Sequence, residues 1–264
     1  MCGRSCLPRG VSRNLREGHR KCSHPTMPWD FWLIFFALGA ILPWRGRARL
    51  KKLLAMPQVG TPERLALYAS TIAFQWIAAA VTAWRAWSRG LTPGELGLAI
   101  HGRTRILAAA IVGAAIVASL QWLNLRRIGR SSGKAREFMQ ALAERILPRS
   151  SVELLPYLGL AVTAGLCEEF LYRGFAMAAL TRAGLPIWSV ILLSSLLFGL
   201  AHLYQGRGGF VGTMLIGAVF GTARIVYGGL APVVLWHIAV DAVAGIAGPG
   251  YLLRAAKPVL GAET

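Results

Sequence analysis

Charged residues are scarce in this sequence, and acidic residues are the rarest among them. Only 15% of the 264 residues are charged, whereas a soluble domain carries about a quarter. Hydrophobic residues make up 55% of the chain and gather in long apolar runs. This composition excludes an ordinary soluble domain. It predicts a multi-pass protein of a cell membrane.

The shortage of acidic residues leaves a formal net charge of +18, from 29 Lys and Arg against 11 Asp and Glu. Such an excess could indicate a nucleic-acid-binding protein. However, the basic residues cluster between the apolar runs, which is typical of cytoplasmic loops beside anionic lipid. No nucleic-acid recognition motif is present either, so we expect the lipid bilayer as a partner and no nucleic acid.

Cysteine is too sparse to build a disulfide framework, since the chain has only four. Three of them lie in residues 1–26, at spacings that match no standard zinc site. The fourth, Cys167, is predicted to be a small buried side chain. The soluble zinc-protease pattern His-Glu-x-x-His is also missing, so that precedent does not apply.

Basic and apolar stretches divide the chain into four parts. Residues 1–26 are polar and basic without apolar periodicity, so we expect a disordered tail, with Met27 as a candidate start of the mature chain. Residues 27–149 are predicted to form N-terminal membrane helices and a basic linker. Residues 150–248 are predicted to form a core of further membrane helices, and residues 249–264 a short C-terminal tail.

The fold class predicted by this pattern is all-α: a polytopic membrane helical bundle of about seven transmembrane helices. The predicted spans cover about residues 28–44, 65–87, 106–125, 152–180, 187–203, 210–227 and 230–246. The linker 126–150 holds seven Lys and Arg residues, and its middle is predicted to form an amphipathic helix on the membrane surface. By the positive-inside rule, this linker and the loop 45–64 face the cytoplasm.

Three short motifs place polar side chains inside the apolar runs of the core. They are Glu168, Glu169 and Arg173; Phe198 and His202; and His237 and Asp241. Ionised groups at membrane depth cost several kcal/mol each unless they are paired or face a polar cavity. We therefore predict that the three motifs meet in one site inside the helical bundle.

The depth of these residues constrains how they can meet. His202 is predicted near the cytoplasmic end of its span, whereas His237 lies deeper. Glu168 can meet both only if the long helix 152–180 begins well inside the cytoplasm. The cavity of the site should then open toward the cytoplasm.

The paired glutamates are predicted to differ in role. Glu169 and Arg173 are four residues apart, so they share a helix face and can form a buried ion pair. Glu168 points to another side of the helix and is free to act as a general base. A purely structural ion pair that holds helices together is the alternative.

Two chemistries fit these ionisable residues. Glu168, His202, His237 and Asp241 could bind zinc or another divalent metal, which activates a bound water. Alternatively, Glu168 and His202 could activate water directly, while His237 and Asp241 stabilise an oxyanion. The residues alone leave both routes open.

In these motifs the sequence resembles the CPBP family of intramembrane proteases, which includes CAAX prenyl proteases of the second type and bacteriocin-processing and immunity proteins. The family pattern is Glu-Glu-x-x-x-Arg, Phe-x-x-x-His and His-x-x-x-Asn or Asp, and the match covers about residues 150–248. The resemblance implies an intramembrane endopeptidase, metallo- or glutamate-dependent, that cleaves a membrane protein or peptide. It implies Glu168 and His202 as the residues that activate water, with His237 and Asp241 on the oxyanion side.

The resemblance also places Glu169 among the catalytic residues, with Arg173 and Phe198 as structural support. The last motif of this chain ends in Asp241 rather than Asn. Because an ionised carboxylate cannot donate to an oxyanion, this departure favours a role in binding metal or in orienting His237. Nothing in the sequence indicates that the substrate is prenylated.

Two other functions stay open at this point. A non-catalytic membrane immunity or scaffold protein could keep the same fold without needing both histidines. A proton-coupled transporter could use the carboxylates as a relay, although we find no inverted repeat and no paired broken helices in the sequence.

Overall fold

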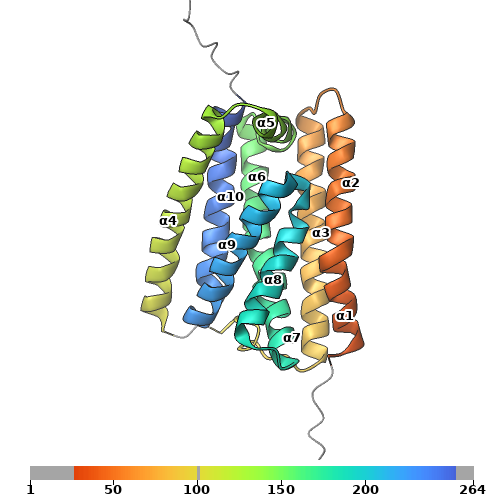
Figure 1. Ribbon diagram of the computed structural model, residues 1–264, viewed down its shortest axis with the longest axis vertical. Coiled ribbons are helices and arrows are strands. Elements are labelled where there is room, and N and C mark those ends of the chain that lie inside the picture. The colour runs from red at the N-terminus through yellow and green to blue at the C-terminus, as the bar shows by residue number, and fades with distance from the viewer. Residues whose placement is uncertain (1–26, 100–101, 254–264) are drawn as a thin grey trace, which may run out of the picture.

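The computed structural model describes residues 27–99 and 102–253, and all of the regular structure within them is helical (Figure 1). The elements are α1 (Trp29–Phe36), η1 (Ala37–Ile41), α2 (Leu42–Ala55), α3 (Thr61–Ser88), α4 (Arg103–Arg130), α5 (Lys134–Ile146), α6 (Ser151–Glu169), η2 (Phe170–Ala176), α7 (Met177–Arg182), α8 (Ile187–Ala201), η3 (Leu203–Gln205), α9 (Gly206–Tyr227) and α10 (Ala231–Leu252). The expected all-α class is confirmed. The predictions for residues 1–26, and for most of the tail 249–264, lie outside the described residues.

Five helices in the described part of the chain are long and apolar enough to cross a membrane. They are Thr61–Ser88, Thr104–Arg130, Ser151–Arg182, Leu203–Tyr227 and Ala231–Leu252. By contrast, α8 has only 15 residues, about 22 Å at 1.5 Å per residue, which is less than a hydrocarbon core of about 30 Å. The structure is therefore that of a multi-pass membrane protein, with five candidate spans where we expected about seven.

The first helix extends further than the apolar run that begins it. The basic stretch after Trp44 was expected to be a loop, but it continues the helix as α2 to Ala55. A π-helical turn, η1, joins α1 to α2 just before Pro43. Because proline lacks an N–H for the carbonyl four residues earlier, a widened turn lets it fit within a continuous helix.

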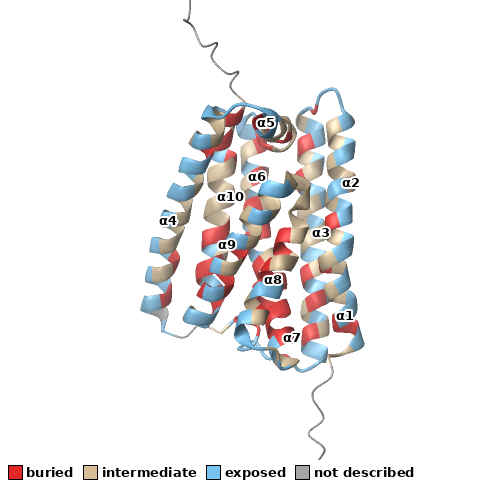
Figure 2. Cartoon of the chain, in the orientation of Figure 1, coloured by how far each residue is buried: buried red, intermediate tan, exposed pale blue. Residues whose placement is uncertain are grey.

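The long helix formed by α6, η2 and α7 occupies the centre of the bundle. It packs between α3 and α10, while α4 lies along α10 and α9 packs against α8 (Figure 1). Buried residues concentrate on these inner faces, as Figure 2 shows. The outer faces of α3 and α4 expose large apolar side chains such as Trp84 and Leu120, as expected for helices in contact with lipid.

The basic linker contains α5, which crosses the end of the bundle and is seen end-on in Figure 1. Leu142 and Ala143 on its inner face are buried, and Arg136 donates to the carbonyl of Tyr251 at 3.4 Å. The expected helix in the linker is therefore confirmed. Its position on a membrane surface stays a prediction.

A buried ion pair, which was not predicted from the sequence, holds this end of the bundle together. Arg64 of α3 donates to both carboxylate oxygens of Glu153 on α6, at 2.8 and 3.0 Å. The hydroxyl of Thr61 and the backbone N–H of Arg149 donate to the same carboxylate at 2.5 and 2.7 Å. Arg64 also donates to the carbonyl of Val59 at 2.6 Å. We refer to Arg64 and Glu153 as the clamp pair.

Helix α8 ends before it reaches the end of the bundle that α5 covers (Figure 1). His202 caps α8, so its side chain lies within the bundle rather than at that end. The shortness of α8 therefore helps to bring His202 to the depth of Glu168, and the projection of the long helix into the cytoplasm stays a prediction.

Candidate active site

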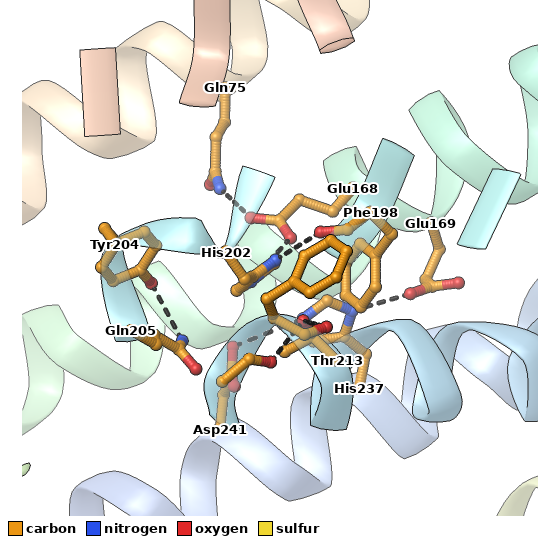
Figure 3. A network of polar contacts seen from close by, with 12 residues as sticks. Gln75, Glu168, Glu169, Phe198, His202, Tyr204, Gln205, Thr213, His237 and Asp241 are labelled. Carbon is orange, nitrogen blue, oxygen red and sulfur yellow. Dashed lines mark hydrogen bonds and ion pairs between the residues drawn. The ribbon is translucent and has the colours of Figure 1, made fainter. Parts of the chain in front are cut away.

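The first motif spans the end of α6 and the turn η2, the second lies at the end of α8, and the third lies in the middle of α10. The polar side chains labelled in Figure 3 from these motifs gather in one place. The backbone becomes π-helical directly after Glu169, at η2. Ser194 of α8 donates to the carbonyl of Tyr172 in this turn at 2.8 Å, which ties the widened segment to α8. Single π-helical turns of this kind are frequent at functional sites.

Arg173, Glu169 and His237 form a buried hydrogen-bonded chain. Arg173 Nη1 and His237 Nδ1 both donate to Oε1 of Glu169, each at 2.8 Å. The side chains of Arg173 and Glu169 are fully buried. The guanidinium carbon of Arg173 also lies 4.1 Å from the ring centre of Phe198 and 5.7 Å from that of Phe220. The expected ion pair is thus present, and it has a further member, His237, on another helix.

The second ring nitrogen of His237 faces Asp241, one helical turn later. Its Nε2 lies 3.6 Å from Asp241 Oδ2, which is longer than a hydrogen bond. Because Nδ1 already donates to Glu169, the imidazole can serve carboxylates at both nitrogens only when it carries both protons. In that doubly protonated form, His237 would present an Nε2–H on the wall of the cavity described below.

His202 is oriented by the backbone of its own helix. Its Nδ1 bonds to the carbonyl oxygen of Phe198 at 2.8 Å. Since a carbonyl only accepts, the proton is on Nδ1 and a lone pair is left on Nε2. The rings of Phe198 and His202 pack together as expected, with centroids 4.6 Å apart.

Glu168 is held on one side and open on the other. Gln75 Nε2 on α3 donates to Oε1 of Glu168 at 2.6 Å. The other oxygen, Oε2, is buried without a hydrogen-bond partner among the described residues, and it faces His202 Nε2 at 3.9 Å. This separation is too long for a direct hydrogen bond, but one water could bridge the two acceptors.

Gln75 was not predicted as a member of the site, because it lies on α3 outside the three motifs. The available signal was a carboxamide within the apolar run 65–87. A Ser or Thr in a membrane helix can bond the carbonyl one turn earlier, whereas Gln needs a partner on another element.

The site lies at the inner end of a cavity of about 940 Å³ between α4, α5, α6, α9 and α10. Glu168, His202, His237 and Asp241 line it, and Phe138 of α5 lines its far end. It therefore reaches the end of the bundle that the charge pattern predicts to be cytoplasmic. A second cavity of about 240 Å³ lies between α2, α3 and α8, and it also reaches Glu168 and His202.

The nitrogen and oxygen donors at the site are types that zinc accepts. Within the described residues, however, no three His, Cys, Asp or Glu side chains converge closely enough to hold a metal ion. The zinc or other divalent metal that the sequence left open therefore does not fit this arrangement of side chains, and we derive no step through it.

Comparison with protein families identifies the central part of the chain. Residues 150–243 match the model described as Rce1-like, type II CAAX prenyl endopeptidase. No curated protein and no solved structure matches the chain. The matched segment begins at the start of α6 and contains all three motifs that face one another in Figure 3. The chain thus carries a domain of the Rce1-like type II CAAX prenyl endopeptidase (CPBP) family, which is a family of proteases.

Proposed function

We propose that the protein is an intramembrane endopeptidase that hydrolyses a peptide bond of a membrane-associated protein or peptide. The observation that carries this proposal is the pair of open acceptors, Glu168 Oε2 and His202 Nε2, which lie 3.9 Å apart on a cavity inside the bundle. The protease family of the matched segment supports it.

The two acceptors suit a nucleophilic water. A water has two protons, so it can donate one to Glu168 Oε2 and the other to His202 Nε2. Its lone pairs then point into the cavity, where a substrate carbonyl would lie. Gln75 holds the opposite oxygen of Glu168 and the Phe198 carbonyl holds the opposite nitrogen of His202, so neither acceptor is free to turn away.

His237 is placed to stabilise the oxyanion that forms when water attacks. Its Nε2–H faces the cavity, and Glu169 with Arg173 fixes the ring through Nδ1. In this proposal Asp241 faces Nε2 and helps to orient the imidazole ring, rather than donating to the oxyanion itself.

The proton path of the proposed reaction is short. Water adds to the carbonyl carbon while Glu168 takes its proton, which gives a tetrahedral oxyanion beside His237. The carbon–nitrogen bond then breaks, and Glu168 returns the proton to the leaving amine. The products are a carboxylic acid and an amine, and transfer of the remaining water proton from the acid to the amine gives a carboxylate and an ammonium group, so Glu168 ends as it began.

The shape of the large cavity indicates the class of substrate. Apolar side chains form most of its wall, and the cavity runs between the helices while staying partly open to the outside. An extended apolar segment of a membrane protein or peptide fits such a space. The proposal does not require a prenylated substrate.

The test compares membrane proteomes of cells that express the wild-type chain or Glu168→Gln. This variant keeps the size of the side chain and removes the base, so turnover should fall by ~10²-fold or more and uncut substrates should accumulate. Glu63→Gln, an exposed site on α3, makes the same chemical change away from the cavity and serves as the control.

Purified protein and an accumulated substrate then give the decisive measurement. Wild-type cleavage by Glu168→Gln would refute the proposal and favour the non-catalytic alternative. A chelator separates the two chemistries: full activity supports direct activation of water by Glu168, whereas a loss that zinc restores would show that substrate or metal rearranges the site.

A further inference from the structure

Gln75 has one end of its carboxamide in use and the other open. Its Nε2 donates to Glu168 at 2.6 Å, whereas its Oε1 is buried without a hydrogen-bond partner among the described residues. An amide that only joins two membrane helices would gain most by satisfying both ends. A buried acceptor left unpaired is unfavourable by itself, so the open oxygen points to a missing partner.

The position of Gln75 indicates what that partner is. Gln75, Glu168 and His202 belong to the walls of both cavities, the large one beside α10 and the small one beside α2. These three side chains therefore lie where the two cavities meet, and a peptide that occupied both cavities would pass beside them. The groups that a peptide carries along its length and that can donate to a carboxamide oxygen are its backbone N–H groups.

We propose that Gln75 is a substrate-positioning residue that links peptide binding to the alignment of Glu168. Its Oε1 accepts a backbone N–H of the bound peptide next to the scissile bond, and its Nε2 holds Glu168 with Oε2 toward His202. This inference rests on the proposed endopeptidase function. It adds a residue from α3, outside the segment 150–243 that matches the family.

The carboxamide is suited to this double role. It is neutral, it donates to a carboxylate through nitrogen, and it accepts through oxygen in the same plane. A glutamate at this position would accept an N–H but would repel Glu168 when ionised. A methionine has nearly the same shape and does neither.

The first test measures kcat and KM for Gln75→Met and Gln75→Glu on a peptide cut from an identified substrate. We expect Gln75→Met to raise KM and to lower kcat, each by about tenfold, the scale of one buried hydrogen bond. Gln75→Glu should keep a KM near the wild type but lose kcat. Its kcat relative to wild type should rise as the pH is lowered, because a protonated carboxyl group can donate to Glu168 again.

Matched measurements separate this role from a structural one. Gln58→Met makes the same change at an exposed loop position and should leave kcat, KM and the melting temperature unchanged. Wild-type kcat and KM in a folded Gln75→Met would overturn the proposal. Equal losses in both Gln75 variants at every pH would also overturn it, since a packing role would not respond to protonation.

A second test follows Glu168 without any cleavage. A hydrophobic carbodiimide labels protonated carboxyl groups, and mass spectrometry measures its addition to Glu168. Loss of the Gln75 donor destabilises the ionised form, so labelling should be higher in Gln75→Met than in wild type at the same pH. Unchanged labelling would refute the link to Glu168. If no peptide is ever cut, the proposed function fails, and with it the proposal that Gln75 binds a peptide N–H. The labelling experiment still decides whether Gln75 stabilises the ionised form of Glu168.

Discussion

The central helix carries two buried glutamate–arginine pairs, and they are built differently. In the clamp pair, Arg64 reaches both oxygens of Glu153, and two further N–H or O–H groups complete that carboxylate. In the pair at the site, Arg173 reaches a single oxygen of Glu169, which it shares with His237. Both carboxylates are fully buried, so burial does not distinguish them.

The difference lies in the groups left without a partner. Among the described residues, Nε and Nη2 of Arg173, Oε2 of Glu169 and Oε2 of Glu168 are buried and unbonded, whereas no atom of the clamp pair is. An unmade buried hydrogen bond costs about 1–3 kcal/mol, more for a charged group. Of these residues Glu168 lines both cavities, so its open oxygen is the one placed to meet water or substrate, and we attribute the incomplete pair beside it to the proposed reaction rather than to stability.

The comparison predicts that loss of one arginine affects stability unequally. Arg64→Ala leaves a buried carboxylate without its cation, so the free energy of unfolding should fall by about 3–5 kcal/mol. Arg173→Ala should cost less, because Glu169 keeps the N–H of His237 and the lost guanidinium was only partly bonded. Thermal unfolding and folded yield in detergent measure both.

The same two variants also give outcomes that would contradict this view. If Arg173→Ala destabilises the protein as much as Arg64→Ala, the pair at the site is as structural as the clamp pair. A fully stable but inactive Arg173→Ala would instead show that Arg173 serves the reaction alone, through Glu169 and His237 or through the substrate, and adds nothing to stability.

Replacement of each whole pair by apolar residues should separate structure from activity. The double variant Arg64→Met with Glu153→Leu removes both charges at once, which is often nearly neutral for stability, and activity should stay close to wild type. Glu169→Leu with Arg173→Met should fold comparably but lose ~10²-fold or more in kcat, because His237 loses the group that fixes the orientation of its ring. Equal activity of the two double variants would remove the distinction between the pairs.

The local part of the structure could be predicted from the sequence. Apolar runs located the long helices, and the pattern of the linker predicted α5. Helix ends were less predictable, because Lys and Arg are good helix formers and let α2 continue through a basic stretch that reads as a loop. Spacing of four residues also predicted the pairing of Glu169 with Arg173 and the shared face of His237 and Asp241.

Contacts between distant helices could not be predicted in this way. The bond from Gln75 to Glu168 spans 93 positions in the chain, the clamp pair spans 89, and the bond from His237 to Glu169 spans 68. Hydropathy fixes which residues are buried but not which helices become neighbours. A buried polar side chain therefore predicts that a partner exists, but the sequence does not identify which residue it is.

Asp241 offers a smaller test, at the edge of the site. Its side chain is about one third exposed and lies 3.6 Å from His237, so it is less tightly held than Glu169. In Asp241→Asn the amide oxygen can still accept from His237, and kcat/KM should fall by less than ~10-fold, whereas Asp241→Ala should lose more. A loss of ~10²-fold or more in Asp241→Asn would show that the negative charge itself is required.

The smallest effect is expected at a third pair, which lies on the surface at the other end of the bundle. Arg182 at the end of α7 lies 2.8 Å from Glu95, and both side chains are more than one third exposed. The backbone N–H of Thr92, its hydroxyl and Arg182 all donate to Glu95, and they hold the pKa of that carboxyl below its ordinary value of 4.5.

A carboxyl group with a lower pKa in the folded chain adds stability above pH 4.5, and this stability is lost as the pH falls through its folded pKa. Because the pair is exposed and screened by salt, the melting temperature in detergent should fall only slightly more between pH 7 and pH 4 in wild type than in Glu95→Gln. Identical acid responses would show that Glu95 adds nothing. A drop as large as that of Arg64→Ala would show that exposure does not separate strong pairs from weak ones in this fold.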